Sequence, residues 1–124
     1  MEFGQKTPGA AACGDVIMHS GTSSYNADVL DASMNVPVIV DFWAPWCGPC
    51  LQMAPAFAKA AAALEPRVRL AKTNTEAAPT LGVRYGIQAI PTMVLFKGGR
   101  EVARQSGALQ TAGIVRFAEA HLGM

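Results

Sequence analysis

The chain has 124 residues, a formal net charge of +1 and a charged fraction of 15%. This length fits one domain, and a hydrophobic fraction of 51% excludes a disordered chain. The balanced charge gives no general electrostatic case for binding nucleic acid or an anionic membrane, and no apolar run approaches the ~18 residues of a transmembrane helix. We therefore expect a small soluble domain with an ordinary core, with a monomer as the default.

The first residues differ in composition from the rest of the chain. They are rich in Gly and Ala and include Pro8, and they lack the basic start and apolar stretch of an export signal. We expect a flexible tail over residues 1–14 and one folded domain over residues 15–124. The missing export signal predicts a reducing, cytoplasmic location.

Strand-like and helix-like segments alternate in the first half of the domain. A β-capable run at 16–18 precedes a helix predicted over 25–32. Nearly continuous apolar sequence over 36–43 predicts a strand buried on both faces. The Ala-rich segment 50–64 predicts a long helix, which Pro55 should kink.

The second half continues this alternation. We expect a strand over 68–72, a short helix over 79–85, and strands over 92–96 and 101–105 joined by a tight turn at Gly98-Gly99. A final helix is predicted over 111–122. The order of elements predicts an α/β fold in which a central mixed sheet is flanked by helices on both faces.

The strongest chemical signal is the pair Cys47 and Cys50, with Gly48-Pro49 between them, at the start of the long helix. Two cysteines at this spacing can close a small disulfide ring. A thiol at a helix N-terminus meets unpaired N–H groups and the positive end of the helix dipole, which favour the nucleophilic thiolate. We therefore expect Cys47 to attack and Cys50, one turn further in, to resolve the mixed disulfide.

Two other interpretations of this pair are weaker. A zinc site needs more ligands, and the remaining candidates, Cys13, His19 and His121, lie far apart in the sequence, so we predict no metal. A purely structural disulfide would close a loop too short to stabilise much. Cys13 is expected to be a bystander thiol in the tail.

The segment Val40 to Cys50 resembles the active-site segment of the thioredoxin family. Further matches follow along the chain: Met53-Ala54-Pro55, Leu70-Ala71-Lys72, Tyr85-Gly86-Ile87, Ala89-Ile90-Pro91-Thr92, Leu95-Phe96-Lys97-Gly98-Gly99 and Gly107-Ala108-Leu109. The resemblance covers residues 16–122. It implies a thioredoxin fold and reduction of protein disulfides, with no cofactor beyond the cysteine pair. It also implies disulfide-containing protein substrates and electrons from a flavin-containing, NADPH-dependent thioredoxin reductase.

The resemblance also implies roles for individual residues. Cys47 matches the attacking and Cys50 the resolving cysteine, Asp41 the buried acid behind them, and Lys72 its charged neighbour. Pro91 matches the cis-proline that faces the cysteines. The residues that match the apolar surface where partners dock are Trp46, Gly48, Pro49, Ile90, Pro91 and Gly107.

The residues around Asp41 agree with a proton-transfer role. Asp41 follows Val38-Ile39-Val40, so its carboxylate should be desolvated, and desolvation raises the pKa of a carboxyl group. Such a group can accept the proton of Cys50 near neutral pH. The alternative is a hydrogen-bonded structural Asp. Lys72 is expected to pair with Asp41, the alternative being an amine that extends to solvent. Trp43 is expected to lie in the core.

One departure from the family pattern and two alternative functions remain. Leu51 occupies a position where the family usually carries Lys or Arg, which should make the partner surface more apolar. An oxidase or isomerase on the same fold usually has a histidine between its cysteines, where this chain has Gly48-Pro49. A binding module, in which the apolar surface clamps a partner, would keep its effect without Cys47 and Cys50.

Overall fold

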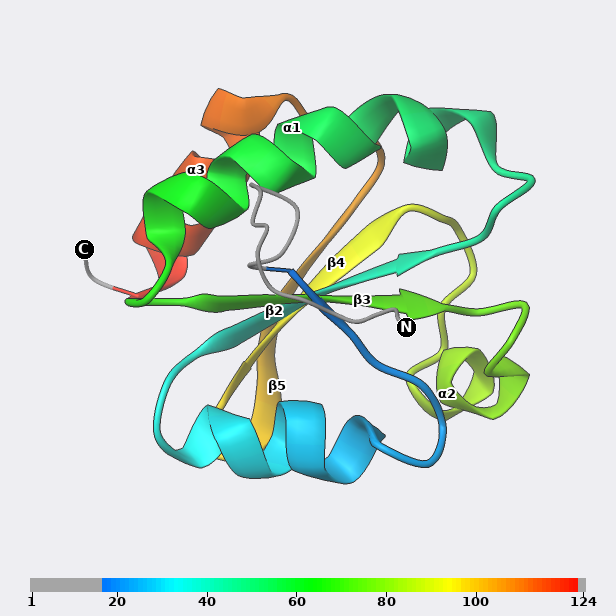
Figure 1. Ribbon diagram of the computed structural model, residues 1–124, viewed down its shortest axis with the longest axis horizontal. Helices are drawn as coiled ribbons and strands as arrows, with labels where there is room; N and C mark the ends of the chain where they lie inside the picture. The colour runs from blue at the N-terminus through cyan, green and yellow to red at the C-terminus, as the bar shows by residue number, and fades with distance from the viewer. Residues whose placement is uncertain (1–16, 123–124) are drawn as a thin grey trace, which may run out of the picture.

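The structure is a computed structural model that describes residues 17–122, and it is built on a five-stranded sheet in the order β1-β3-β2-β4-β5 (Figure 1). The predicted tail at 1–14, with Cys13, lies outside the described residues. The strands are β1 (Met18–His19), β2 (Val38–Trp43), β3 (Arg69–Asn74), β4 (Thr92–Lys97) and β5 (Arg100–Ser106).

The sheet is mixed, with β2 at its centre. β2 runs parallel to β3 and antiparallel to β4, and β4 forms an antiparallel hairpin with β5. Every residue of β2 except Trp43 is buried, as expected for a central strand covered on both faces. Helices lie on both sides of the sheet (Figure 1). This arrangement confirms the predicted α/β class and architecture.

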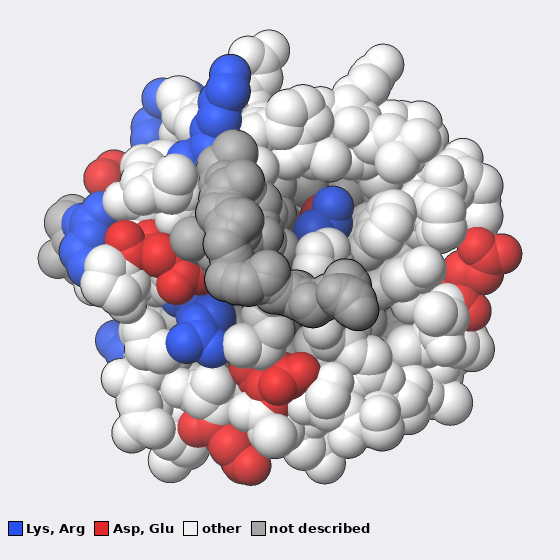
Figure 2. Space-filling model, in the orientation of Figure 1, with Lys and Arg blue, Asp and Glu red and all other residues white. Residues whose placement is uncertain are grey.

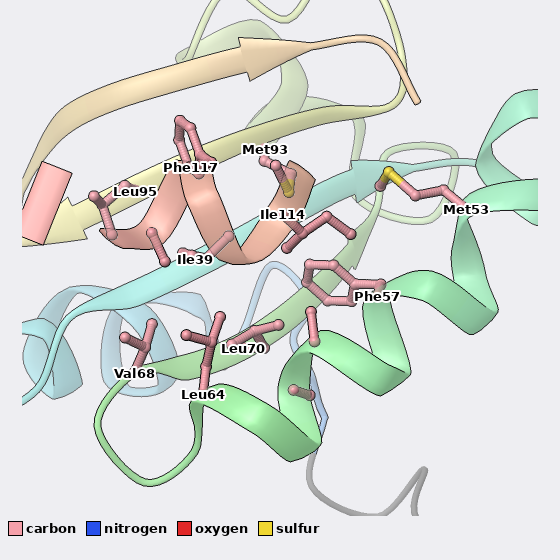
Figure 3. Close-up of a cluster of buried hydrophobic side chains, with 13 residues drawn as sticks. Ile39, Met53, Phe57, Leu64, Val68, Leu70, Met93, Leu95, Ile114 and Phe117 are labelled. Carbon is pink, nitrogen blue, oxygen red and sulfur yellow. The ribbon is translucent and has the colours of Figure 1, made fainter. Parts of the chain in front are cut away.

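Two helices cover one face of the sheet: α1 (Gly48–Leu64) and α3 (Thr111–Leu122). α1 continues as a helix through Pro55. The helices and the sheet enclose the larger hydrophobic core (Figure 3). Its buried members include Ile39, Met53, Phe57, Leu64, Val68, Leu70, Met93, Leu95, Ile114 and Phe117.

The other face is covered by shorter helical segments. The helix predicted over 25–32 is a π-helical segment, η2 (Asn26–Asp31), followed by the 3₁₀ turn η3 (Ala32–Met34). α2 (Pro79–Arg84) lies on the same side (Figure 1). An aromatic cluster fills the space between these segments and the sheet. Its rings belong to Tyr25, Phe42, Tyr85 and Phe96.

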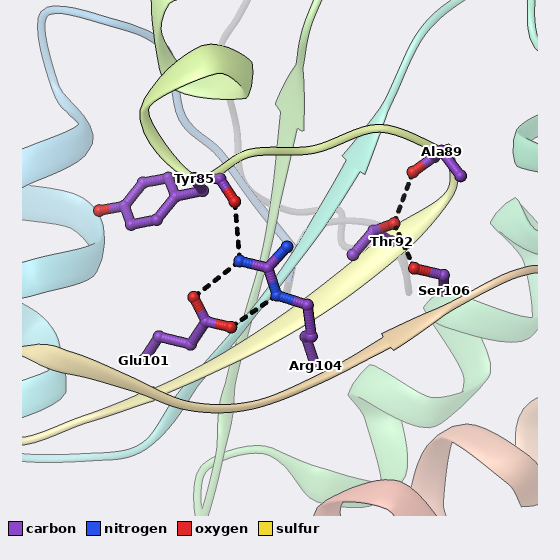
Figure 4. A network of polar contacts seen from close by, with 6 residues as sticks. All are labelled: Tyr85, Ala89, Thr92, Glu101, Arg104 and Ser106. Carbon is purple, nitrogen blue, oxygen red and sulfur yellow. Dashed lines mark hydrogen bonds and ion pairs between the residues drawn. The ribbon is translucent and has the colours of Figure 1, made fainter.

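Polar contacts fix the connection between α2 and β4, which carries Ile90 and Pro91. The Arg104 guanidinium on β5 donates to the Tyr85 carbonyl oxygen at 2.7 Å and to the Glu101 carboxylate at 2.6 and 2.9 Å (Figure 4). At the other end of the connection, the Thr92 hydroxyl contacts the carbonyl oxygen of Ala89 and lies 3.0 Å from the Ser106 hydroxyl. β5 therefore anchors the segment that lies against the cysteines.

The predicted turn between β4 and β5 is confirmed at Gly98-Gly99. Both residues have positive φ, +65° and +85°, as in a type I′ hairpin. Their N–H groups donate to Ser33, at 2.8 Å to its carbonyl oxygen and 2.9 Å to its hydroxyl. A Cβ on Gly99 would also lie 3.2 Å from the Met34 sulfur.

Replacing Gly99 by alanine should lower the free energy of unfolding by ~1–2 kcal/mol, because an L-residue is strained at this φ. Urea unfolding measures the change. Gly21→Ala is the control, since no atom of residues 17–122 lies within 4 Å of its Cβ position and it has no positive φ. An equal effect of the two substitutions would contradict the role given to the turn.

Candidate active site

The cysteine pair lies where β2 passes into α1. Cys47 is the N-cap of α1, and its sulfur accepts a hydrogen bond from the Cys50 N–H at 3.2 Å. The two residues form a disulfide, with their Cα atoms 5.2 Å apart. Cys47 is 5% and Cys50 1% exposed, so Cys47 is the more accessible, in the predicted order. A partner must therefore fit closely over Cys47 to reach its sulfur.

The first turn of α1 suits an ionised sulfur. Pro49 occupies a first-turn position, where its missing N–H breaks no helical hydrogen bond. The first turn has no acidic residue. After reduction, the Cys50 N–H and the positive end of the helix dipole would both stabilise a thiolate at Cys47.

A second segment, around the cis peptide bond Ile90–Pro91, lies against the disulfide. The Cys47 sulfur is 3.7 Å from the Ile90 carbonyl oxygen. Gly107, with φ +97°, donates its N–H to the Pro91 carbonyl oxygen at 2.8 Å. The segment around Ile90–Pro91 therefore lies against Cys47, and the segment around Gly107 is bonded to it in turn.

The residues predicted to dock partners differ in exposure. Trp46 is 70% exposed, Ile90 is half-buried and Pro91 is buried. Gly48, Pro49 and Gly107 are exposed. Leu51, the departure from the family pattern, is 52% exposed beside them.

A hollow of about 210 Å³ borders Trp46 and Ile90. Thr75 and Gln88 also line it, and sequence reasoning missed both. Thr75 follows β3, and the end of a strand parallel to β2 was the available signal. Its N–H and hydroxyl donate to the Trp43 carbonyl oxygen at 2.8 and 3.0 Å.

Asp41 is fully buried on β2, and neither carboxylate oxygen has a hydrogen-bond partner among residues 17–122. Desolvation raises its pKa to about 7, against an opposing influence of Lys72. Side chains alternate along a strand, so Asp41 shares a face with Ile39, in the core under α1, and Trp43, which packs against the disulfide. Asp41 therefore lies on the α1 side of the sheet, next in its row to the residue that contacts the disulfide.

Lys72 is the register neighbour of Asp41, but no ion pair within 4 Å links the two in the part of the chain that is described. The Lys72 amine instead lies 4.6 Å from the centre of the Trp43 ring. A cation in this position is attracted by the ring face, which competes with direct pairing. The expected contact is replaced by a longer-range one, and Trp43 is half-buried instead of lying in the core.

Replacing Lys72 by methionine should raise the pKa of Asp41 further, because the positive charge favours the carboxylate. NMR titration of the Asp41 carboxyl carbon measures the shift. Lys72→Arg, which keeps the charge, is the matched control. An unchanged pKa in Lys72→Met would show that the two groups do not interact.

Within residues 17–122 no group of three or more His, Cys, Asp or Glu side chains is placed to hold a metal ion. Across the same residues, every helix is too short or too polar to span a bilayer.

Comparisons with known proteins point to one family. The family model described as Thioredoxin matches residues 16–120. Thioredoxin 1 of Nostoc sp. is 42% identical over 100 residues, covering 81% of this chain and 92% of its own length. Thioredoxin of Acidithiobacillus ferridurans is 41% identical over 108 residues, covering 87% and 98%. Thioredoxin M-type, chloroplastic, of Chlamydomonas reinhardtii is 39% identical over 118 residues, covering 91% and 83%.

The fold, the Cys47–Cys50 disulfide at a helix N-terminus and these matches lead to one assignment. The chain belongs to the thioredoxin family and is a thiol–disulfide oxidoreductase.

Proposed function

We propose that the chain acts chiefly as a reductant of protein disulfides through Cys47-Gly48-Pro49-Cys50. The observation that carries this proposal is the cysteine pair at the N-cap of α1, bordered by the exposed ring of Trp46. The helix end supports a reactive thiolate at Cys47, and the exposed apolar surface supports contact with another protein.

In the first step, the Cys47 thiolate attacks one sulfur of the partner disulfide. A Cys47–partner disulfide forms, and the other partner sulfur leaves as a thiolate that takes a proton from water. The Ile90 carbonyl oxygen, 3.7 Å from the Cys47 sulfur, supports the docking of an extended partner segment beside it.

In the second step, Cys50 loses its proton and attacks the Cys47 sulfur. The Cys47–Cys50 disulfide forms, the second partner sulfur leaves, and two electrons have passed to the partner. We assign the uptake of the Cys50 proton to Asp41. This role is supported by a pKa of about 7 and by a buried carboxylate that has no hydrogen-bond partner among residues 17–122.

The proposed partners are disulfide-containing proteins and a flavin-containing, NADPH-dependent thioredoxin reductase that regenerates the dithiol. Lys72 supports the cycle from a distance by favouring the ionised form of Asp41. A reductant needs a compartment in which its dithiol is maintained, and the cytoplasm is the location that we propose.

The test is NADPH oxidation in the presence of insulin and a thioredoxin reductase. We expect turnover that depends on this chain, and equilibration with glutathione should show a more reducing pair than glutathione itself. A folded protein without turnover with several reductases, or a more oxidising pair, would contradict the proposal. A Cys47/Cys50 double Ser variant that kept the biological effect would instead favour a binding module.

A further inference from the structure

Apart from the cysteine pair, the three segments around the disulfide carry no side chain that is charged near neutral pH. Residues 42–58, 85–96 and 105–115 lack Asp, Glu, Lys, Arg and His, although together they make up about a third of the chain. The charged residues that flank them are Asp41, Lys59, Arg84, Lys97, Arg104 and Arg116. The exposed surface that these segments form around Cys47 is therefore neutral. The charged side chains behind it are Asp41, which is fully buried, and Lys72, which is half-buried with its amine 4.6 Å from the Trp43 ring.

The space-filling view agrees with this reading. The part of the visible face over the connection from β2 to α1 is almost entirely white, and most charged side chains lie towards the edges of the view, apart from one blue group with red beside it in a hollow near the centre (Figure 2). The exposed apolar members of the three segments include Trp46, at 70%, and Leu51, at 52%. The exposed polar members are neutral, and the glutamines among them are Gln52, Gln88, Gln105 and Gln110.

The hollow beside Trp46 is uncharged as well. It has a volume of about 210 Å³, and its lining contains no charged residue. The Thr75 hydroxyl in its wall is engaged by the Trp43 carbonyl oxygen. The other polar groups on its lining side chains are the Gln88 amide and the Trp46 indole N–H, and both are neutral. The hollow therefore offers an incoming side chain apolar contact and neutral hydrogen bonds.

A neutral surface of this kind distinguishes charged from uncharged partner side chains by the cost of removing their water. A charged side chain pressed against it loses hydration and gains no opposite charge, whereas an apolar or amide side chain loses little. The surface also creates little field of its own, so it does not steer charged partners over a distance. Neither an acidic nor a basic partner therefore gains binding energy or a faster encounter from the charge of this surface.

We propose that this neutral surface selects protein disulfides in which the attacked cysteine is flanked by uncharged, mainly apolar residues. This selection rests on the proposed reductase function and adds the substrate class to it. Leu51 and Gln88 are specificity-determining positions, since a charge at either one would end the neutrality next to Cys47.

The experiment is a single-turnover stopped-flow measurement with the reduced protein and no reductase. Three peptides carry the same internal disulfide, with the attacked cysteine flanked by Leu and Gln, by Lys, or by Glu. Each rate constant is divided by that for dithiothreitol and the same peptide, which removes the intrinsic effect of the peptide charge on thiolate attack.

The neutral peptide should react about tenfold faster than either charged one after this correction. Its rate should change less than about twofold as NaCl rises from low to high concentration. A Lys or Glu peptide that equals or exceeds the neutral one would overturn the selection. If none of the peptides reacts faster than with dithiothreitol, the reductase function itself is wrong as well.

Variants localise the effect. Leu51→Lys should shift the preference several-fold towards the Glu peptide, and the shift should fade at high salt. Leu51→Met should keep the preference for the neutral peptide. Val102→Lys adds the same charge outside the three segments, at a residue that is 47% exposed. It should leave the ratios of the three corrected rate constants unchanged. Equal shifts in Leu51→Lys and Val102→Lys would show that the surface is not the selecting element.

Discussion

Replacing Cys47 by serine should abolish the reduction of insulin, with a loss of at least about 10³-fold, because a serine hydroxyl is not ionised at neutral pH and is a far weaker nucleophile. The assay is NADPH oxidation with a reductase. Circular dichroism should show an unchanged fold, because Cys47 and Cys50 close a loop too short to carry much stability.

Replacing Cys50 by serine should have a different result. Cys47 would still attack, but the mixed disulfide would persist, and non-reducing electrophoresis should show covalent complexes that dithiothreitol releases. Expressing this variant in the native host would identify the substrates by mass spectrometry. Complexes formed by Cys47→Ser but not by Cys50→Ser would reverse the assigned roles.

The second large effect concerns the stability contributed by Asp41. Its pKa is 3.8 in an unfolded reference and about 7 in the fold. Between these values the unfolded chain ionises while the folded protein keeps its proton, so stability falls as pH rises from about 4 to 7. The penalty is complete above pH 7 and corresponds to ~4 kcal/mol.

Asp41→Asn should remove this penalty while leaving a buried amide without partners. We therefore expect the variant to be more stable than the natural protein by ~2 kcal/mol at pH 8, with the difference shrinking towards pH 4. Urea unfolding at both pH values measures it. A stability difference that is the same at pH 4 and pH 8 would mean that Asp41 does not titrate in this range.

The same substitution should slow the second chemical step. Without the carboxylate, the Cys50 proton must pass directly to solvent. The loss of a general base typically lowers the rate of such a step by about 10²-fold or more. The mixed disulfide should therefore have a longer lifetime in the variant at pH 7. The difference in lifetime between the variant and the natural protein should become smaller at high pH, because the Cys50 thiol then ionises without a general base. This pH dependence separates a proton role from a purely structural one.

Much of the fold could be predicted from local signals. The apolar run before Trp43 gave a buried central strand, the Gly98-Gly99 pair gave the hairpin, and the helix over 111–122 has the predicted bounds. These features depend on side-chain periodicity and on glycine conformation, which a short stretch of sequence carries. The spacing of Cys47 and Cys50 is likewise a local signal, and it predicted the thiol–disulfide chemistry.

Other features depend on distant contacts, and the sequence did not reveal them. The cis bond at Glu65–Pro66 and the π-helical geometry of η2 have no clear local signature. The amine of Lys72 lies over Trp43 because two neighbouring strands place them together. The contribution of Thr75 to the hollow likewise arises only when β3 aligns beside β2.

The measurement that tests the account most directly is the rate at which iodoacetamide alkylates each cysteine of the reduced protein as a function of pH. We expect Cys47 to react first and its rate to level off below pH 8, where an ordinary thiol, with a pKa of about 8.5, is still mostly protonated. Rates for both cysteines that keep rising beyond pH 9, or a Cys47 that resists alkylation, would contradict a thiolate held at the start of α1.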